Sequence, residues 1–314
     1  MTTILNLRTM ISLHFTWLFI SGKAFFFFFL VYICYRYGHI KLGYPNDEPE
    51  FSLVTYSCMI FATGVASGLF VYAVAEPLFH QNNNFFTNPG YRSQDEIDMF
   101  AINTTVNNWA ITGWTFYTMV AVCMALATHR FHLPFTARSC FYPILHHYTW
   151  GWLGDVIDAM TIVISIGGIS TSMGLGAAEI VVGLIHLGFV DKYIRLDQMS
   201  SIQITVTWVI TIICTASVIS GIHGGIRLLS LIACVVGFML WCTILLLDDT
   251  KYLLNLVVQE FGYFLQTSLF QLNFWTDAFG QLREGSGRAI DGKASADWWM
   301  DAWTVFYIGW WYVY

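Results

Sequence analysis

Long apolar runs separated by polar connections dominate the pattern of this chain. A run of about 20 apolar residues is long enough to cross the hydrocarbon core of a bilayer as an α-helix. We expect spans near 14–35, 53–74, 105–127, 156–188, 201–220 and 226–247, and a truncated one at 299–314. This pattern predicts an all-α polytopic membrane protein whose residues 1–314 form a single transmembrane domain.

The segment 250–270 has a different periodicity. Its apolar residues, such as Leu253, Val257 and Phe261, recur every three to four positions, and polar residues such as Lys251 and Glu260 lie between them. This spacing predicts an amphipathic helix. We expect it to lie along the bilayer surface or against a partner subunit rather than to cross the membrane.

Composition strengthens the membrane assignment and excludes other classes. The chain is 56% hydrophobic and only 11% charged, whereas soluble domains carry about 25% charged residues. The net charge of -6 includes no Lys/Arg-rich stretch that would favour nucleic acid as a partner. The seven cysteines are scattered without CxxC spacing, which favours buried thiols over a metal or redox site. We expect a multi-pass protein of the plasma membrane.

Two groups of aromatic residues are candidates for ligand binding. They are Trp109, Trp114 and Tyr117 inside one apolar run, and Trp310, Trp311 and Tyr314 near the end of the chain. At about 100° of turn per residue, the first trio spans an arc of roughly 140° and the second roughly 100°. Each trio can therefore face one cavity, where aromatic faces attract a quaternary ammonium or sulfonium group. The alternative is an aromatic girdle at the membrane interface.

A glycine-containing stretch, FATGVASGLFVYAVAEPLFH at 61–80, lies in the second run. Small residues four positions apart, such as Gly64 and Gly68, have two interpretations. They permit close helix packing, or they mark an unwound stretch whose free carbonyls bind an ion or substrate. The sequence leaves both open, with packing the simpler interpretation.

Several segments in order resemble the betaine/choline/carnitine transporter (BCCT) family, from about residue 35 to residue 314. They include RYGHIKLG, NNWAITGWTFYTMVA, STSMGLG and WTVFYIGWW. The resemblance implies a leucine-transporter-like fold of two inverted repeats. The chain would cover the second to eighth family helices, so that the first repeat is complete and the second is truncated.

The resemblance also implies roles for single residues. Trp109, Trp114, Tyr117 and Trp311 match the aromatic box of the family, and Trp310 and Tyr314 match neighbouring positions. The family's unwound glycine motif, here without its central glycine, matches Gly64, Val65, Ala66, Ser67 and Gly68.

Ion coupling is left open by the resemblance. Sodium-coupled members carry two hydroxyl residues four positions apart, and this chain has Ser165 and Ile169 there. Glu179 stands where glutamine is usual, and an ionisable residue within an apolar helix suggests a functional role. The resemblance is therefore consistent with either Na+ or H+ coupling, and it implies no cofactor or metal.

The leading hypothesis is a secondary active transporter, by symport or exchange, of quaternary-ammonium or sulfonium compounds such as the zwitterions glycine betaine and carnitine, choline, or a sulfonium osmolyte. A homotrimer with contacts at 250–270 is also implied by the resemblance. One alternative is a non-transporting fragment or assembly subunit of such a transporter. A membrane enzyme is disfavoured, because the histidines form no cluster with metal-binding spacing and neither HExxH nor GxSxG occurs.

Overall fold

The computed structural model describes residues 2–44, 46–64, 66–82, 93–191, 193 and 196–276. All secondary-structure elements in these residues are helices, which confirms the all-α class. In chain order they are α1 (Thr2–Tyr37), α2 (Leu53–Gly64), α3 (Ala66–Asn82), α4 (Gln94–Asn107), η2 (Asn108–Thr112), α5 (Gly113–Ala125), η3 (Leu126–Arg130), α6 (Ala137–Cys140), α7 (Tyr142–Leu145), η4 (His146–Trp150), α8 (Trp152–His186), α9 (Leu196–Ile219), η5 (Ile222–Ile226), α10 (Arg227–Leu247), α11 (Thr250–Thr267) and η6 (Leu272–Phe274).

Among the residues that the structure describes, five helical segments are long and apolar enough to cross a membrane: His14–Tyr37, Gln94–Arg130, Trp152–His186, Gln198–Ile219 and Ile222–Leu247. Their apolar side chains are largely unburied. In α9, none of the most apolar window is buried although its mean hydropathy is 2.0. Helices that are apolar on all sides and uncovered by protein are stable in hydrocarbon, not in water. The protein is therefore an integral membrane protein.

The described residues pack as two compact units that alternate along the chain. One unit takes its residues from Met1–Asp47, Val74–Ser165 and Val258–Tyr314, and the other from Glu48–Ala73 and Ile166–Val257. The first unit contains α4, η2 and α5, which carry the first aromatic trio. The predicted single domain and its exact span boundaries stay predictions.

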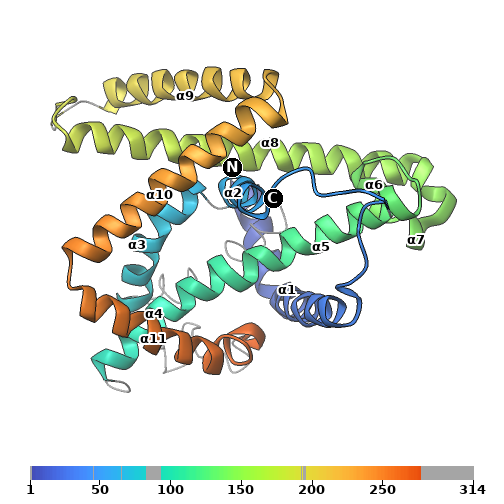
Figure 1. Cartoon of the computed structure of the whole chain (residues 1–314), viewed down its shortest axis with the longest axis horizontal. Helices are drawn as coiled ribbons and strands as arrows, with labels where there is room; N and C mark the ends of the chain where they lie inside the picture. Colours follow the sequence, from blue (N-terminus) through green and yellow to red (C-terminus); the bar gives the residue numbers. More distant parts are fainter. Residues whose placement is uncertain are drawn as a thin grey trace. The chain divides into compact units, whose positions relative to one another are not determined.

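Aromatic side chains hold α1 within the first unit. Figure 1 shows α1 alongside α5, and Phe26 meets Phe116 edge to face with ring centroids 6.3 Å apart. Phe28 stacks on Phe270 and Phe274, at 6.1 and 6.0 Å. Such aromatic pairs add about 0.5–1.5 kcal/mol each beyond the area they bury, so α1 is anchored on two sides.

Helix α4 starts at a capping box. The Ser93 hydroxyl accepts the Glu96 backbone N–H, and the Glu96 carboxylate accepts the Ser93 backbone N–H at 2.9 Å. This arrangement satisfies donors that a helix start otherwise leaves unpaired. From there the chain remains helical to Arg130, so the aromatic trio lies on one continuous rod.

Side chains of α11 and of the residue just after it contact α4. The Ser268 hydroxyl, just after α11, donates to Asn103 Oδ1 at 3.0 Å, and Gln259 Nε2 approaches Met99 Sδ at 3.3 Å. Glu260 is 7% exposed, and within the described part of the chain both of its carboxylate oxygens lack a hydrogen-bond partner. Burial raises the pKa of Glu260 from its usual value near 4.5 to about 8. Helix α11 therefore carries an uncompensated acidic group.

The second unit contains a helical hairpin and a helix pair. Gln203 on α9 donates to the Gly174 carbonyl on α8 at 3.1 Å. Helix α10 packs on α2, where the Cys234 thiol approaches the Cys58 carbonyl at 3.7 Å. Between α9 and η5, Gly221 adopts a φ of +78°, which glycine tolerates without strain. This turn lets the chain reverse direction between two apolar helices.

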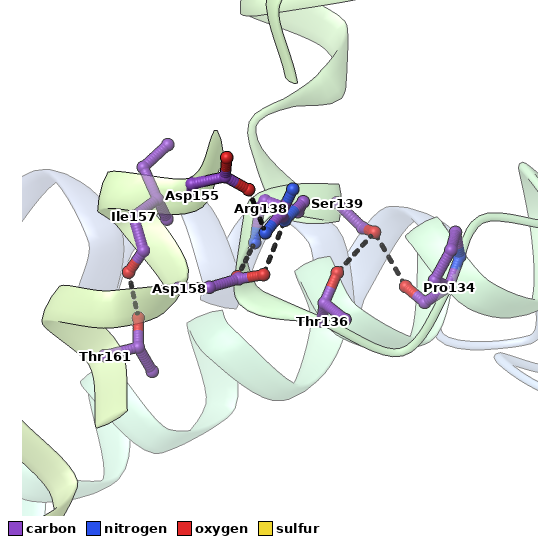
Figure 2. A network of polar contacts seen from close by, with 8 residues as sticks. All are labelled: Pro134, Thr136, Arg138, Ser139, Asp155, Ile157, Asp158 and Thr161. Atoms are coloured by element: carbon purple, nitrogen blue, oxygen red, sulfur yellow. Dashed lines mark hydrogen bonds and ion pairs between the residues drawn. The ribbon is translucent and has the colours of Figure 1, made fainter. Parts of the chain in front are cut away.

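Arg138 holds the connection after η3 against the start of α8. Figure 2 shows its guanidinium between Asp155 and Asp158 of α8. The guanidinium nitrogen lies 2.8 Å from Asp155 Oδ1, and the backbone N–H of Arg138 donates to Asp158 Oδ1 at 3.0 Å. The hydrogen bond to Asp158, with a further contribution from Asp155, raises the pKa of Arg138. Charge-assisted contacts to two carboxylates fix the direction in which α8 leaves this connection.

Gly154, in the first turn of α8, lies close to the same connection. A Cβ at this position would lie 1.8 Å from the Thr149 carbonyl oxygen and 3.3 Å from Arg138 Cδ. Because the nearest atom belongs to the backbone of Thr149 and cannot easily move, Gly154→Ala is expected to lower the free energy of unfolding by about 1–3 kcal/mol. A thermal unfolding series in detergent measures this loss. The control is Gly183→Ala on the same helix, where nothing lies within 4 Å; equal midpoints for the two variants would contradict the packing.

Glu260 predicts a pH-dependent stability. Below about pH 4.5 its carboxyl is protonated in the folded and the unfolded state, so it has little effect. Between about pH 4.5 and 8 the unfolded state releases the proton and the folded state does not, so folding weakens as the pH rises. Glu260→Gln is expected to unfold later than the wild type at pH 8 and about equally at pH 4.5. Exposed Glu48→Gln is the matched control, and a parallel pH response in all three proteins would refute the assignment.

Candidate aromatic binding site

A π-helical turn carries the first tryptophan of the trio. In η2 the backbone N–H of Gly113 reaches the carbonyl of Asn108, five residues back. In a helix with i→i+5 hydrogen bonds, residues that are five positions apart lie roughly one above the other. Such π-turns are frequent at functional sites. Trp109 and Trp114 are five apart, so the wider turn brings them closer to one face than the 140° expected for an α-helix.

Trp114 and Tyr117 form the second part of the site. Their ring centroids are 5.9 Å apart with an interplanar angle of 46°, and both side chains are half-buried on α5. Tilted aromatic rings at this spacing present π faces and edges to the same volume. The pair therefore offers a surface that attracts a cation without requiring hydrogen bonds from it.

A buried carboxylate from another helix holds Trp109. Glu76 on α3 is 1% exposed, and its Oε1 accepts the indole N–H of Trp109 at 2.9 Å. Its Oε2 faces Asn108 Nδ2 at 3.5 Å and His80 Nε2 at 3.8 Å. The half-buried indole of Trp109 is thereby tied to a helix 33 residues earlier in the chain.

Two further polar side chains flank Trp109. Asn107 and Thr112 are fully or almost fully buried, and among the described residues the Asn107 amide and the Thr112 hydroxyl have no hydrogen-bond partner. Unpaired buried polar groups cost about 1–3 kcal/mol each.

A comparison with protein families identifies the chain. Residues 1–314 match the model of the betaine/carnitine/choline family transporters, BCCT. The chain belongs to the BCCT family. The resemblance seen in the sequence motifs is thus confirmed.

Several BCCT relatives are similar over nearly the whole chain. The osmo-dependent choline transporter BetT2 of Acinetobacter baylyi is 32% identical over 96% of this chain and 40% of its own length. Glycine betaine transporter 1 of Vibrio parahaemolyticus is 31% identical over 99% and 55%, and the high-affinity choline transport protein of Escherichia coli K12 is 30% identical over 96% and 41%. The chain spans about half the length of the curated relatives that it matches.

The structure brings together only part of the predicted box. Trp109, Trp114 and Tyr117 share one continuous helical rod. Trp310, Trp311 and Tyr314 lie outside the described residues. Their contribution to the site stays a prediction.

The predicted glycine motif lies at the boundary between two helices. Gly64 is the last residue of α2, and Ala66, Ser67 and Gly68 begin α3. Val65 lies outside the described residues. A role of this motif in binding substrate or ion stays a prediction.

The two residues considered for ion coupling lie on α8. Ser165 is exposed, and so is Ile169, which occupies the position of the second hydroxyl. Glu179 is half-buried. Because Ile169 supplies no oxygen, this stretch offers only one of the two side-chain oxygens that sodium-coupled members have.

Sequence reasoning missed Glu76 and Asn108. The signal was present, because Glu76 is an ionisable residue at the end of an apolar run, where such residues need a specific partner. The partner itself, 33 residues away, could not be identified from spacing alone.

Proposed function

We propose that the protein is a secondary active transporter of quaternary ammonium or sulfonium compounds, working by symport or exchange. The observation that supports the proposal is the contact between Trp114 and Tyr117 on the same helical rod that carries Trp109 in a π-turn. Membership of the BCCT family and relatives named as choline and glycine betaine transporters support it.

The chemistry of the site suits a methylated onium head. Such a head carries its positive charge beneath methyl groups and donates no strong hydrogen bond, so it offers carboxylates and carbonyls no directional contact. Aromatic faces attract it electrostatically and also bury its methyl groups. A box of indole and phenol rings thus compensates for the water that the cation loses on entering the membrane.

An aromatic girdle at the membrane interface is the competing explanation. Girdle residues are unconnected anchors, and they need no buried polar partner. Trp109 instead donates to the buried Glu76, and Trp114 is paired with Tyr117. These contacts favour a built site over an anchoring belt.

The coupling ion and the assembly remain part of the proposal. Both Na+ and H+ coupling are candidates: Ser165 offers one hydroxyl, Ile169 replaces the second, and Glu179 lies within α8. We also propose a homotrimer with contacts through α11, as the resemblance to the family implies. Uptake measured with and without Na+, and with and without a proton gradient, separates the two couplings.

Trp114→Leu tests the box directly. Removal of one aromatic face of a desolvated cation site costs about 1–2 kcal/mol, so the KM for choline or glycine betaine is expected to rise about five- to thirtyfold. Radiolabelled uptake into cells that express the native gene product measures this change, with surface expression checked on the same cells.

The matched control is Trp208→Leu on α9, where the tryptophan is 65% exposed. We expect its uptake to equal that of the wild type. Unchanged uptake in Trp114→Leu, or an equal loss in both variants, would count against the aromatic box and favour the girdle.

A further inference from the structure

The buried carboxylate of Glu76 has a geometry that the proposed function does not require. It is 1% exposed, and among the described residues it forms no ion pair with a lysine or arginine. A carboxylate placed in a low-dielectric interior is costly unless its oxygens are hydrogen-bonded. Here Oε1 accepts the indole N–H of Trp109, and Oε2 faces the side-chain amide of Asn108 at 3.5 Å and Nε2 of His80 at 3.8 Å.

The contact with Trp109 constrains the indole ring. The indole has a single polar hydrogen, and it can only donate. When this hydrogen points at a fixed oxygen 2.9 Å away, any rotation of the ring about its side-chain bonds breaks the contact. Because the acceptor is a carboxylate, this hydrogen bond is also stronger than a neutral one. The plane of the Trp109 ring is therefore set from α3.

The same contact changes the electrostatics of the ring. A negative group at the indole N–H polarises the ring and adds to its negative quadrupole, which attracts cations. The carboxylate also acts directly on any charge in the site, and such interactions are strong where water is excluded. Neither effect acts on a neutral molecule of the same shape.

We propose that Glu76 is a positioning residue of the aromatic site, which orients Trp109 and makes the site select a cation over an uncharged molecule of equal size. The inference rests on the proposed function and deepens it. It assigns the discrimination between charged and neutral ligands to a residue outside the ring box. Shape recognition alone would not distinguish a cation from an uncharged molecule of equal size.

The test compares choline with 3,3-dimethylbutan-1-ol, in which carbon replaces the ammonium nitrogen. The measured quantity is the ratio of their inhibition constants against labelled choline uptake by the native gene product. Glu76→Gln keeps an oxygen for the indole N–H but removes the charge. We expect this variant to lower the preference for choline about five- to tenfold, chiefly through KM, with the maximal rate largely retained.

Trp109→Phe provides a second and independent variant, because it removes the indole N–H and leaves Glu76 in place. If the carboxylate acts through the ring, Glu76→Gln in the Trp109→Phe background should change the preference much less than it does alone. The matched control is Glu260→Gln, another buried carboxylate of the same unit. It should leave the preference unchanged.

The outcomes separate the two proposals. If the wild-type protein takes up choline and Glu76→Gln keeps the wild-type preference, the role of Glu76 is overturned and the transport function stands. A loss of maximal rate in Glu76→Gln without any change in preference would also overturn it, because that result indicates a purely structural residue. Wild-type protein that takes up no onium compound would overturn the proposed function itself.

Discussion

The absence of water around the apolar helices is the constraint on which the rest of the structure depends. In hydrocarbon, each polar group has to find its partner within the protein. Most hydroxyl side chains do so locally. Thr161, Thr171 and Thr211, for example, donate to the carbonyl four residues earlier in their own helix. Such bonds carry no information about the tertiary fold, since any helix can make them.

Long-range polar contacts are different, because each requires two elements in a defined register. Among the described residues of the first unit, they include Glu76 with Trp109, Asn103 with Ser268, and Arg138 with the two aspartates of α8. The contact of Asn103 with Ser268 is buried, and that of Glu76 with Trp109 is partly buried. These two fix α3 and the end of α11 against the rod that carries the aromatic residues, whereas Arg138 fixes the start of α8 against α6. The site is thus positioned by a few polar contacts within mostly apolar packing.

The apolar pattern was sufficient to predict the fold class, because runs as long as those of α9 and α10 are stable only as membrane helices. The same pattern could not predict the local geometry of the site. The arc estimated for Trp109 and Trp114 assumed α-helical turns, and nothing in NNWAITGW marks the π-turn of η2. Glu76 was visible as an acidic residue, but its hydrogen bond to Trp109 depends on how α3 packs, which periodicity does not encode.

The position of Glu76 has a consequence for how a zwitterion would enter the site. Glycine betaine and carnitine carry a carboxylate beside the onium head, and two carboxylates repel each other strongly where the dielectric constant is low. A ligand that placed its own carboxylate near the N–H edge of Trp109 would meet Glu76, whose Oε1 lies 2.9 Å from the indole nitrogen. The favourable orientation therefore puts the methylated head against Trp109 and the ligand carboxylate away from α3. An aromatic box without an anionic partner attracts the head but imposes no such penalty on the tail, so the buried carboxylate would help to set orientation as well as charge preference.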